Sequence, residues 1–140
     1  MSKIAVVYWS GTGNTEEMAK AVALGARGAG AGCDLMTCDQ MDASKAAKYD
    51  ALIFGCPAMG AESLEEDEFQ PMFDAVKGAL AGKRIALFGS YGWGGGEWMQ
   101  LWESDCAAAG VTLAHESVIC NEAPDDEAIA ACKALGAALA

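Results

Sequence analysis

Short apolar runs along the chain alternate with longer segments in which apolar residues recur every three or four positions. The runs have the length of strands that are buried on both faces, and the longer segments have the period of amphipathic helices. Strands are expected at Lys3–Trp9, Asp34–Thr37, Ala51–Gly55, Arg84–Gly89 and Val111–Ile119. Helices are expected at about 13–27, 42–48, 69–80 and 97–109, and a last one begins at Pro124-Asp125-Asp126.

This alternation predicts an α/β fold of three layers, αβα, with a five-stranded parallel sheet and right-handed crossovers. Ligands bind to such sheets beyond the carboxyl ends of the strands, where the strand order reverses. The loops after the first, third and fourth strands are therefore expected to meet at one crevice. The 140 residues contain no linker and no internal repeat, so we expect a single domain over 1–140.

Helical spacing assigns several side chains to the core. In the segment 97–109, Trp98, Leu101, Trp102 and Cys106 are expected to face inward. Asp42 stands where the short helix begins and is expected to cap it.

The charge balance narrows the choice of partners. The chain has 20 acidic and 9 basic residues, a net charge of −11. This argues against binding to nucleic acid or to an anionic membrane and suits a partner with a positive surface. A solvated acidic surface that only keeps the chain in solution explains the charge equally well. No apolar run is long enough to span a bilayer and no signal-peptide layout is visible, so a cytoplasmic protein is expected.

The cysteines do not indicate a metal site. None of the 6 forms a Cys-x-x-Cys pair, and the chain has a single histidine, His115. A reducing compartment fits this usage best. Cys33, Cys106 and Cys132 fall within strand or helix patterns and are expected in the core, whereas His115 is expected to be structural or solvent-facing within the fifth strand.

The segment Ser10-Gly11-Thr12-Gly13-Asn14-Thr15 joins the first strand to the first helix and is the strongest candidate for a binding site. Its hydroxyl and amide side chains donate hydrogen bonds, its glycines let backbone amides approach a ligand, and a helix N-terminus favours an anion. Because the loop has no lysine or arginine, we expect a small, enclosed phosphomonoester. A nucleoside triphosphate loop requires Gly-Lys-Ser/Thr, and a dinucleotide loop requires a third glycine where Glu16 stands. An ordinary helix cap at Ser10 or Thr12 is the alternative, but one cap needs fewer donors.

Two later loops are suited to hold a flat ring. The loop after the third strand reads Gly55-Cys56-Pro57-Ala58-Met59-Gly60-Ala61-Glu62, in which Met59 is flexible and polarizable and Gly60 can change its peptide orientation. The loop after the fourth strand reads Ser90-Tyr91-Gly92-Trp93-Gly94-Gly95-Gly96. Glycines surround Trp93, so this ring either stacks on a ligand or is exposed.

These three loops, in this order, resemble those of the short-chain, clostridial-type flavodoxins over essentially the whole chain. The resemblance implies a sheet of order 2-1-3-4-5 and a non-covalently bound flavin mononucleotide (FMN). It assigns the phosphate to Ser10, Thr12, Asn14 and Thr15. The implied cofactor-binding residues are Ser10, Gly11, Thr12, Gly13, Asn14, Thr15, Pro57, Ala58, Met59, Gly60, Ala61, Glu62, Ser90, Tyr91, Gly92, Trp93 and Gly96.

Individual roles at the ring follow from the same resemblance. Met59 is implied on the inner face of the isoalloxazine and Trp93 on its outer face. Glu62 is implied to accept a hydrogen bond from N3–H, and the Gly60 carbonyl to turn toward N5–H. Ser90 and the Gly92 amide are implied near the ring and the ribityl chain. Ala61 and Gly95 depart from the polar residues that are usual at these positions.

The implied function is that of a low-potential, one-electron carrier that shuttles between the semiquinone and the hydroquinone of FMN, and is not an enzyme. Basic-surfaced redox proteins are the implied partners, and a monomer is expected. A flavin-dependent NAD(P)H reductase, or a subunit of one, is the alternative. A response-regulator receiver would need acidic residues where Trp9-Ser10 and Gly55-Cys56 stand, and is set aside.

Overall fold

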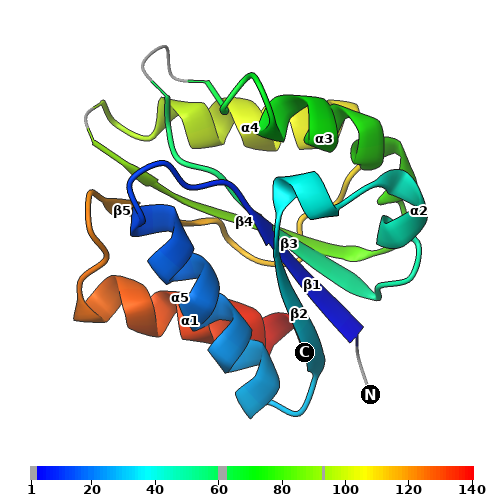
Figure 1. The fold of residues 1–140 in the computed structure, drawn as a ribbon, viewed down its shortest axis with the longest axis horizontal. Coiled ribbons are helices and arrows are strands. Elements are labelled where there is room, and N and C mark those ends of the chain that lie inside the picture. Colours follow the sequence, from blue (N-terminus) through cyan, green and yellow to red (C-terminus); the bar gives the residue numbers. More distant parts are fainter. Residues whose placement is uncertain (1–2, 60–62, 93) are drawn as a thin grey trace.

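The computed structural model describes residues 3–59, 63–92 and 94–140. Five parallel strands form one sheet in the order β2-β1-β3-β4-β5, which confirms the predicted fold class and strand order (Figure 1). The strands are β1 (Lys3–Tyr8), β2 (Gly32–Thr37), β3 (Ala51–Gly55), β4 (Arg84–Tyr91) and β5 (Val118–Asn121). The α-helices are α1 (Asn14–Gly28), α2 (Ala43–Ala46), α3 (Phe69–Val76), α4 (Glu97–Ala108) and α5 (Asp126–Leu139), and two short 3₁₀ helices are η1 (Cys38–Gln40) and η2 (Lys77–Ala79).

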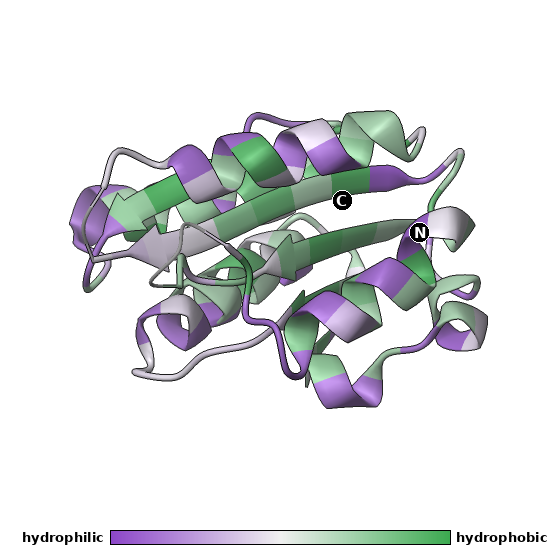
Figure 2. Cartoon of the chain, turned by 90° about the horizontal axis from the view of Figure 1, so that it is seen from above, coloured by the Kyte–Doolittle hydropathy of each residue, from purple (hydrophilic) through white to green (hydrophobic). Residues whose placement is uncertain are grey.

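Helices cover both faces of the sheet. α1 and α5 lie on one face, and α3 and α4 lie on the other (Figure 1). Side chains of β1 alternate between the two resulting cores: Ile4 and Val6 pack toward α1 and α5, and Ala5 and Val7 pack toward the opposite layer. The strands are therefore apolar along their length, while the helices carry mixed polar and apolar surfaces (Figure 2).

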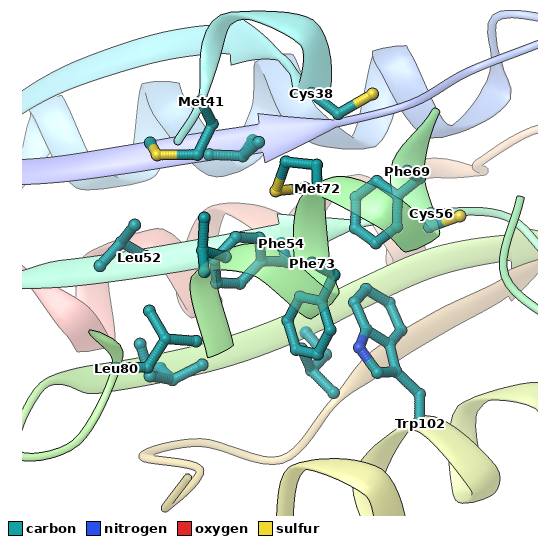
Figure 3. Packing of buried hydrophobic residues seen from close by; sticks show 14 of the residues in the cluster. Cys38, Met41, Leu52, Phe54, Cys56, Phe69, Met72, Phe73, Leu80 and Trp102 are labelled. Carbon is teal, nitrogen blue, oxygen red and sulfur yellow. The ribbon is translucent and has the colours of Figure 1, made fainter. Parts of the chain in front are cut away.

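An aromatic cluster fills the layer between β3, α3 and α4 (Figure 3). Phe73 packs edge-to-face against Phe54 and against Trp102, with ring centroids 5.2 and 5.6 Å apart. The predicted burial of Trp98 and Trp102 is confirmed. Trp102 Nε1 is buried without a hydrogen-bond partner among the described residues. It lies on the side of the indole that faces Phe73, where a ring is a weak acceptor.

The predicted inward orientation of Leu101 is wrong, because this side chain is 61% exposed. Trp98, Met99, Trp102 and Cys106 form the buried face of α4. At about 100° per residue, the centre of this face lies between Trp98 and Met99, and Leu101 is more than a quarter turn away from it. Because leucine is apolar, the sequence pattern predicted a wider buried face for α4 than the structure has.

The fifth strand was predicted too early. Only Leu113 of the segment 111–117 pairs with β4, through a single bridge to Ile85, and regular pairing begins where Val118 meets Phe88. Between these two points β4 advances from 85 to 88, whereas the other chain advances from 113 to 118, so two additional residues bend out of the sheet. His115 lies in this bend, with Nδ1 2.8 Å from the Glu116 carbonyl oxygen, and not in a strand.

Other boundaries differ by one or a few residues. β4 continues through Ser90 and Tyr91, which were predicted in a loop, and α3 ends at Val76 before a turn of 3₁₀ helix. The predicted cap of α2 is confirmed, because the Asp42 carboxylate accepts a hydrogen bond of 2.7 Å from the Lys45 amide. Cys106 and Cys132 are buried as predicted, whereas Cys33 is half-buried.

Close helix packing fixes the position of α1 under the sheet. A Cβ atom at Gly136 of α5 would lie 2.0 Å from the Val22 carbonyl oxygen of α1, and one at Gly25 would lie 1.9 Å from the Lys133 carbonyl oxygen. These two glycines therefore let the backbones of α1 and α5 touch, which holds the N-terminus of α1 in place at the end of β1. No helix in the described ranges is both long and apolar enough to cross a membrane.

Candidate cofactor site

A cavity of about 270 Å³ lies at the carboxyl ends of β1, β3 and β4. Parallel strands end at the same edge of a sheet, and the chain leaves β1 and β3 toward opposite faces, so their loops separate and leave a crevice. The three loops that were predicted to meet do so here. The lining residues are Trp9, Ser10, Gly11, Thr12, Asn14, Thr15, Pro57, Ala58, Met59, Ser90, Tyr91, Gly92 and Glu122.

The loop between β1 and α1 turns at Gly13, which has φ = 98°, a left-handed conformation that favours glycine. Ser10 Oγ accepts hydrogen bonds from the amides of Gly13 and Glu16, at 3.1 and 3.2 Å. Ser10 therefore caps the N-terminus of α1 in part, as in the alternative interpretation of this loop as an ordinary helix cap. The amides of Asn14 and Thr15 open the helix and have no intrahelical carbonyl to bind, so they remain suited to an anion.

Thr15 supplies the test of whether this cavity fits a phosphate. Its side chain is 1% exposed, and Oγ1 has no hydrogen-bond partner among the described residues. An unpaired buried hydroxyl costs about 1–3 kcal/mol. Because Thr15 lines the cavity, a phosphate oxygen bound there would accept the missing hydrogen bond. The residues present therefore fit the phosphate of FMN.

The charges around the cavity are unusual for an anion site. Its described lining contains no lysine and no arginine, and it includes one carboxylate residue, Glu122. The phosphate would be held by neutral donors and by the helix N-terminus. Among the described residues, no group of three or more His, Cys, Asp or Glu is placed to hold a metal ion.

The loop after β3 is fixed by backbone hydrogen bonds to β4 and within the loop itself. The Ala58 amide donates to the Ser90 carbonyl at 3.0 Å, and the Met59 amide donates to the Ser63 carbonyl at 2.9 Å. Met59 is half-buried and lines the cavity. Gly60, Ala61 and Glu62, which follow it, lie outside the described residues, as does Trp93, and their predicted contacts with the ring stay predictions.

Cys56 is the first residue of this loop and is hydrogen-bonded to two other segments of the chain. Its Sγ accepts a hydrogen bond of 3.4 Å from the Glu65 amide, and its carbonyl accepts one of 3.1 Å from Trp98 Nε1. Burial raises the pKa of the Cys56 thiol to about 12. The thiol is therefore protonated at neutral pH and acts as a packing group and not as a nucleophile.

Glu65 has a structural role that the sequence analysis did not recognise. Its buried carboxylate accepts hydrogen bonds from three amides, those of Asp67, Glu68 and Phe69, at 3.0, 2.7 and 2.8 Å. Burial acts to raise the pKa of Glu65, but these amides outweigh it and the net pKa is lowered. Glu65 thus caps α3. Its position four residues before Phe69 was the available signal, but Glu65 is one of four consecutive acidic residues and does not stand out among them.

Among the described candidate residues, Gly13 and Gly96 do not line the cavity, whereas Ser90 does. The Ser90 hydroxyl donates to the Glu122 carbonyl at 2.6 Å, so it ties β4 to the end of β5. Gly96, with φ = 90°, begins α4 and lies beside Ile119, outside the lining of this cavity.

Two lining residues were not among the predicted cofactor-binding residues. Trp9 follows β1 directly and was predicted as the last residue of the first strand. Glu122 follows β5, has φ = 56° and donates its amide to the Tyr91 carbonyl at 2.7 Å. The fifth strand was predicted to end at Ile119, whereas β5 ends at Asn121. Glu122 was therefore not recognised as the residue that directly follows the carboxyl end of this strand.

The chain is similar to several known proteins. The family model described as flavodoxin matches residues 6–135. A flavodoxin of Megasphaera elsdenii is 41% identical over 137 residues, which cover 98% of each chain, and one of Clostridium beijerinckii is 40% identical over 86% of this chain and 88% of its own. The solution structure of the two-electron reduced Megasphaera elsdenii flavodoxin aligns with a TM-score of 0.89 over 97% of both chains. Oxidised flavodoxin 1 of Bacillus cereus aligns with a TM-score of 0.86 at 28% identity, over 99% of this chain and 97% of its own.

Fold, cavity and comparisons together define a small α/β flavoprotein. The chain belongs to the flavodoxin family, in its short-chain, clostridial type. Its cofactor is FMN, and it is an FMN-based electron carrier that serves redox partner proteins.

The lowered pKa of Glu65 predicts a pH-dependent contribution to stability. An unfolded glutamate has a pKa of about 4.3, so the folded carboxylate stabilises the protein above that pH and this contribution is lost as pH falls below it. In the folded protein one carboxylate oxygen of Glu65 accepts from Asp67 and the other accepts from Glu68 and Phe69, whereas a glutamine has a single acceptor oxygen. Glu65→Gln is therefore expected to lower the free energy of unfolding by about 1–2 kcal/mol at pH 7.

Urea unfolding at pH 7 and below pH 4 measures this difference. The difference in free energy of unfolding between wild type and Glu65→Gln should be smaller at the lower pH. The variant Glu66→Gln, at an exposed neighbouring residue, should show no comparable loss of stability at pH 7. A gap that stays constant between the two pH values would contradict the cap.

Proposed function

We propose that this chain is a single FMN-binding domain over residues 1–140 that carries one electron at a time at low potential and has no enzymatic activity of its own. When bound, FMN supplies the redox chemistry, and the protein supplies position, enclosure and electrostatics. No described residue that lines the cavity forms a nucleophile–base pair. The proposal depends on what the lining residues do to the phosphate and to charge on the ring.

The observation that carries the proposal is the buried hydroxyl of Thr15, which has no hydrogen-bond partner in the part of the chain that the structure describes. The side chain is buried, lines the cavity and is adjacent to the N-terminus of α1. Ser10, Thr12 and Asn14 supply neutral donors around it. This arrangement supports a phosphate that is held without a positive side chain.

The same lack of positive charge supports a low potential. A fully reduced flavin carries negative charge on the ring, and the described lining offers no lysine or arginine to stabilise it. Glu122 and the net charge of −11 act in the same direction. The residues of this chain therefore disfavour addition of the second electron and lower the potential of that step, which makes the fully reduced protein a strong reductant.

Met59 supports the proposed placement of the ring. Its side chain lines the cavity, half-buried, and its backbone is fixed by the hydrogen bond to Ser63. A thioether in this position offers a polarizable contact to one face of a flat aromatic group. We propose Trp93 on the opposite face, Glu62 as the acceptor for N3–H and the Gly60 carbonyl as the group that turns toward N5–H.

We also propose that the partners are basic-surfaced redox proteins, that the chain acts as a monomer and that it works in the cytoplasm. The acidic surface provides electrostatic attraction to such partners. All six cysteines are free thiols, which suits a reducing compartment.

Thr15→Val tests the phosphate site. Valine has nearly the shape of threonine but lacks the hydroxyl, so FMN should bind about 10–100-fold more weakly. The protein without FMN should be as stable as wild type or more stable, because the substitution removes an unpaired buried hydroxyl.

Titration of the FMN-free protein with FMN, followed by flavin fluorescence, gives the affinity, and thermal unfolding gives the stability. Thr112→Val, at an exposed threonine, is the matched control. Unchanged FMN affinity together with lower stability would mean that the hydroxyl has only a structural role.

Stepwise reduction of the purified FMN complex tests the electron-carrying role. A one-electron carrier should show an intermediate absorption spectrum at about half reduction, followed by a second step at lower potential. NAD(P)H alone should leave the complex oxidised. Direct transfer of both electrons with no intermediate spectrum, or rapid bleaching by NAD(P)H, would favour a reductase.

The proposed attraction to basic partners predicts a salt effect. The Debye length falls from about 10 Å at 0.1 M salt to about 3 Å at 1 M, so the rate of electron transfer to a basic redox protein should decrease several-fold over this range. Stopped-flow spectroscopy of the reduced protein measures this rate. A rate that is independent of salt would contradict electrostatic attraction.

A further inference from the structure

Trp9 occupies a position that the proposed FMN site does not by itself explain. It follows β1 directly, and its backbone amide extends the strand pairing by donating to the Gly55 carbonyl at 3.1 Å. The side chain is half-buried and packs against the same core as α3 and α4. The indole thus starts from a fixed point between β1 and β3.

The indole ring lies against the backbone of the phosphate loop. A Cβ atom at Gly11 would lie 3.0 Å from Cη2 and 3.3 Å from Cζ3 of Trp9, so a larger residue at this position would press against the ring and displace it slightly. Trp9 lines the FMN cavity and also a second hollow of about 210 Å³ between the loop and η1. The ring therefore packs against the loop at Gly11 and separates the cavity from this second hollow.

The polar end of the indole is fixed by another loop. Trp9 Nε1 donates a hydrogen bond of 3.0 Å to Glu68 Oε2. The Glu68 amide is in turn held by the Glu65 carboxylate at 2.7 Å, within the cap of α3. A continuous chain of contacts therefore runs from Gly11 through Trp9 and Glu68 to the N-terminus of α3.

We propose that Trp9 is a positioning residue that holds the phosphate loop in its binding conformation, through its contact with Gly11 and its hydrogen bond to Glu68. This inference rests on the proposed function, because it concerns the phosphate of FMN. It assigns to Trp9 a contribution to the affinity for the phosphate and none to the affinity for the ring.

A comparison of FMN with riboflavin separates these two contributions, because riboflavin lacks the phosphate. Trp9→Phe keeps an aromatic ring but removes the donor, and Glu68→Ala removes the acceptor. Each should weaken FMN binding about tenfold and change riboflavin binding less than twofold. Glu68→Gln keeps an acceptor oxygen and should restore most of the FMN affinity.

Charge alone predicts the opposite result for Glu68. Removal of a carboxylate near an anion site should strengthen FMN binding. Glu66→Ala, at an exposed neighbour with the same charge change, measures that effect directly. A tenfold loss in Glu68→Ala, with no loss in Glu66→Ala, would therefore identify the hydrogen bond as the cause.

Titrations of the FMN-free variants with both flavins, together with their thermal unfolding, decide the matter. Equal losses for FMN and riboflavin, or no loss for either, would overturn the role of Trp9. If Trp9→Phe does not fold, the Glu68 variants at the surface still give the comparison. A wild-type protein that binds riboflavin but not FMN, or neither flavin, would instead overturn the proposed function.

Discussion

The position of β1 between β2 and β3 is the constraint on which the whole site depends. From β1 the chain passes through α1 to the neighbouring strand β2, and from β3 it passes through α3 to β4, which lies on the other side of β3 in the sheet. The two connections leave in opposite directions, so a crevice opens at the carboxyl ends of β1 and β3. α1 also begins at this point, so its N-terminus and the crevice coincide without further adjustment.

Packing on both faces of the sheet holds this point still. Below it, Gly25 and Gly136 let α1 and α5 approach until their backbones touch. Above it, Phe69 and Phe73 of α3 pack with Trp102 of α4, and the cap from Glu65 fixes where α3 begins (Figure 3). Neutral donors can hold an anion only if they are already in position, because they offer no long-range attraction. The rigid surroundings of the loop and its lack of lysine and arginine are therefore connected.

The acidic residues act at two scales in this protein. The net charge of −11 is a property of the whole surface and is suited to attract basic partners. Glu65 and Glu68, from the same acidic run, instead form specific hydrogen bonds to backbone amides and to the Trp9 indole. A run of like charges in the sequence thus contains both solvated residues and structural ones, and the hydrogen bonds that their carboxylates accept distinguish them.

The sequence by itself determined the elements and their order, because periodicity and glycine-rich turns are local properties. It identified the loop Ser10–Thr15, the burial of Trp98 and Trp102 and the cap at Asp42. Only the tertiary structure decided which of several local possibilities applied: Leu101 faces solvent, two extra residues delay β5, Glu65 is buried, and Glu122 reaches the cavity. These outcomes depend on contacts between residues far apart in the chain, and no local pattern of hydrophobic and polar residues contains that information.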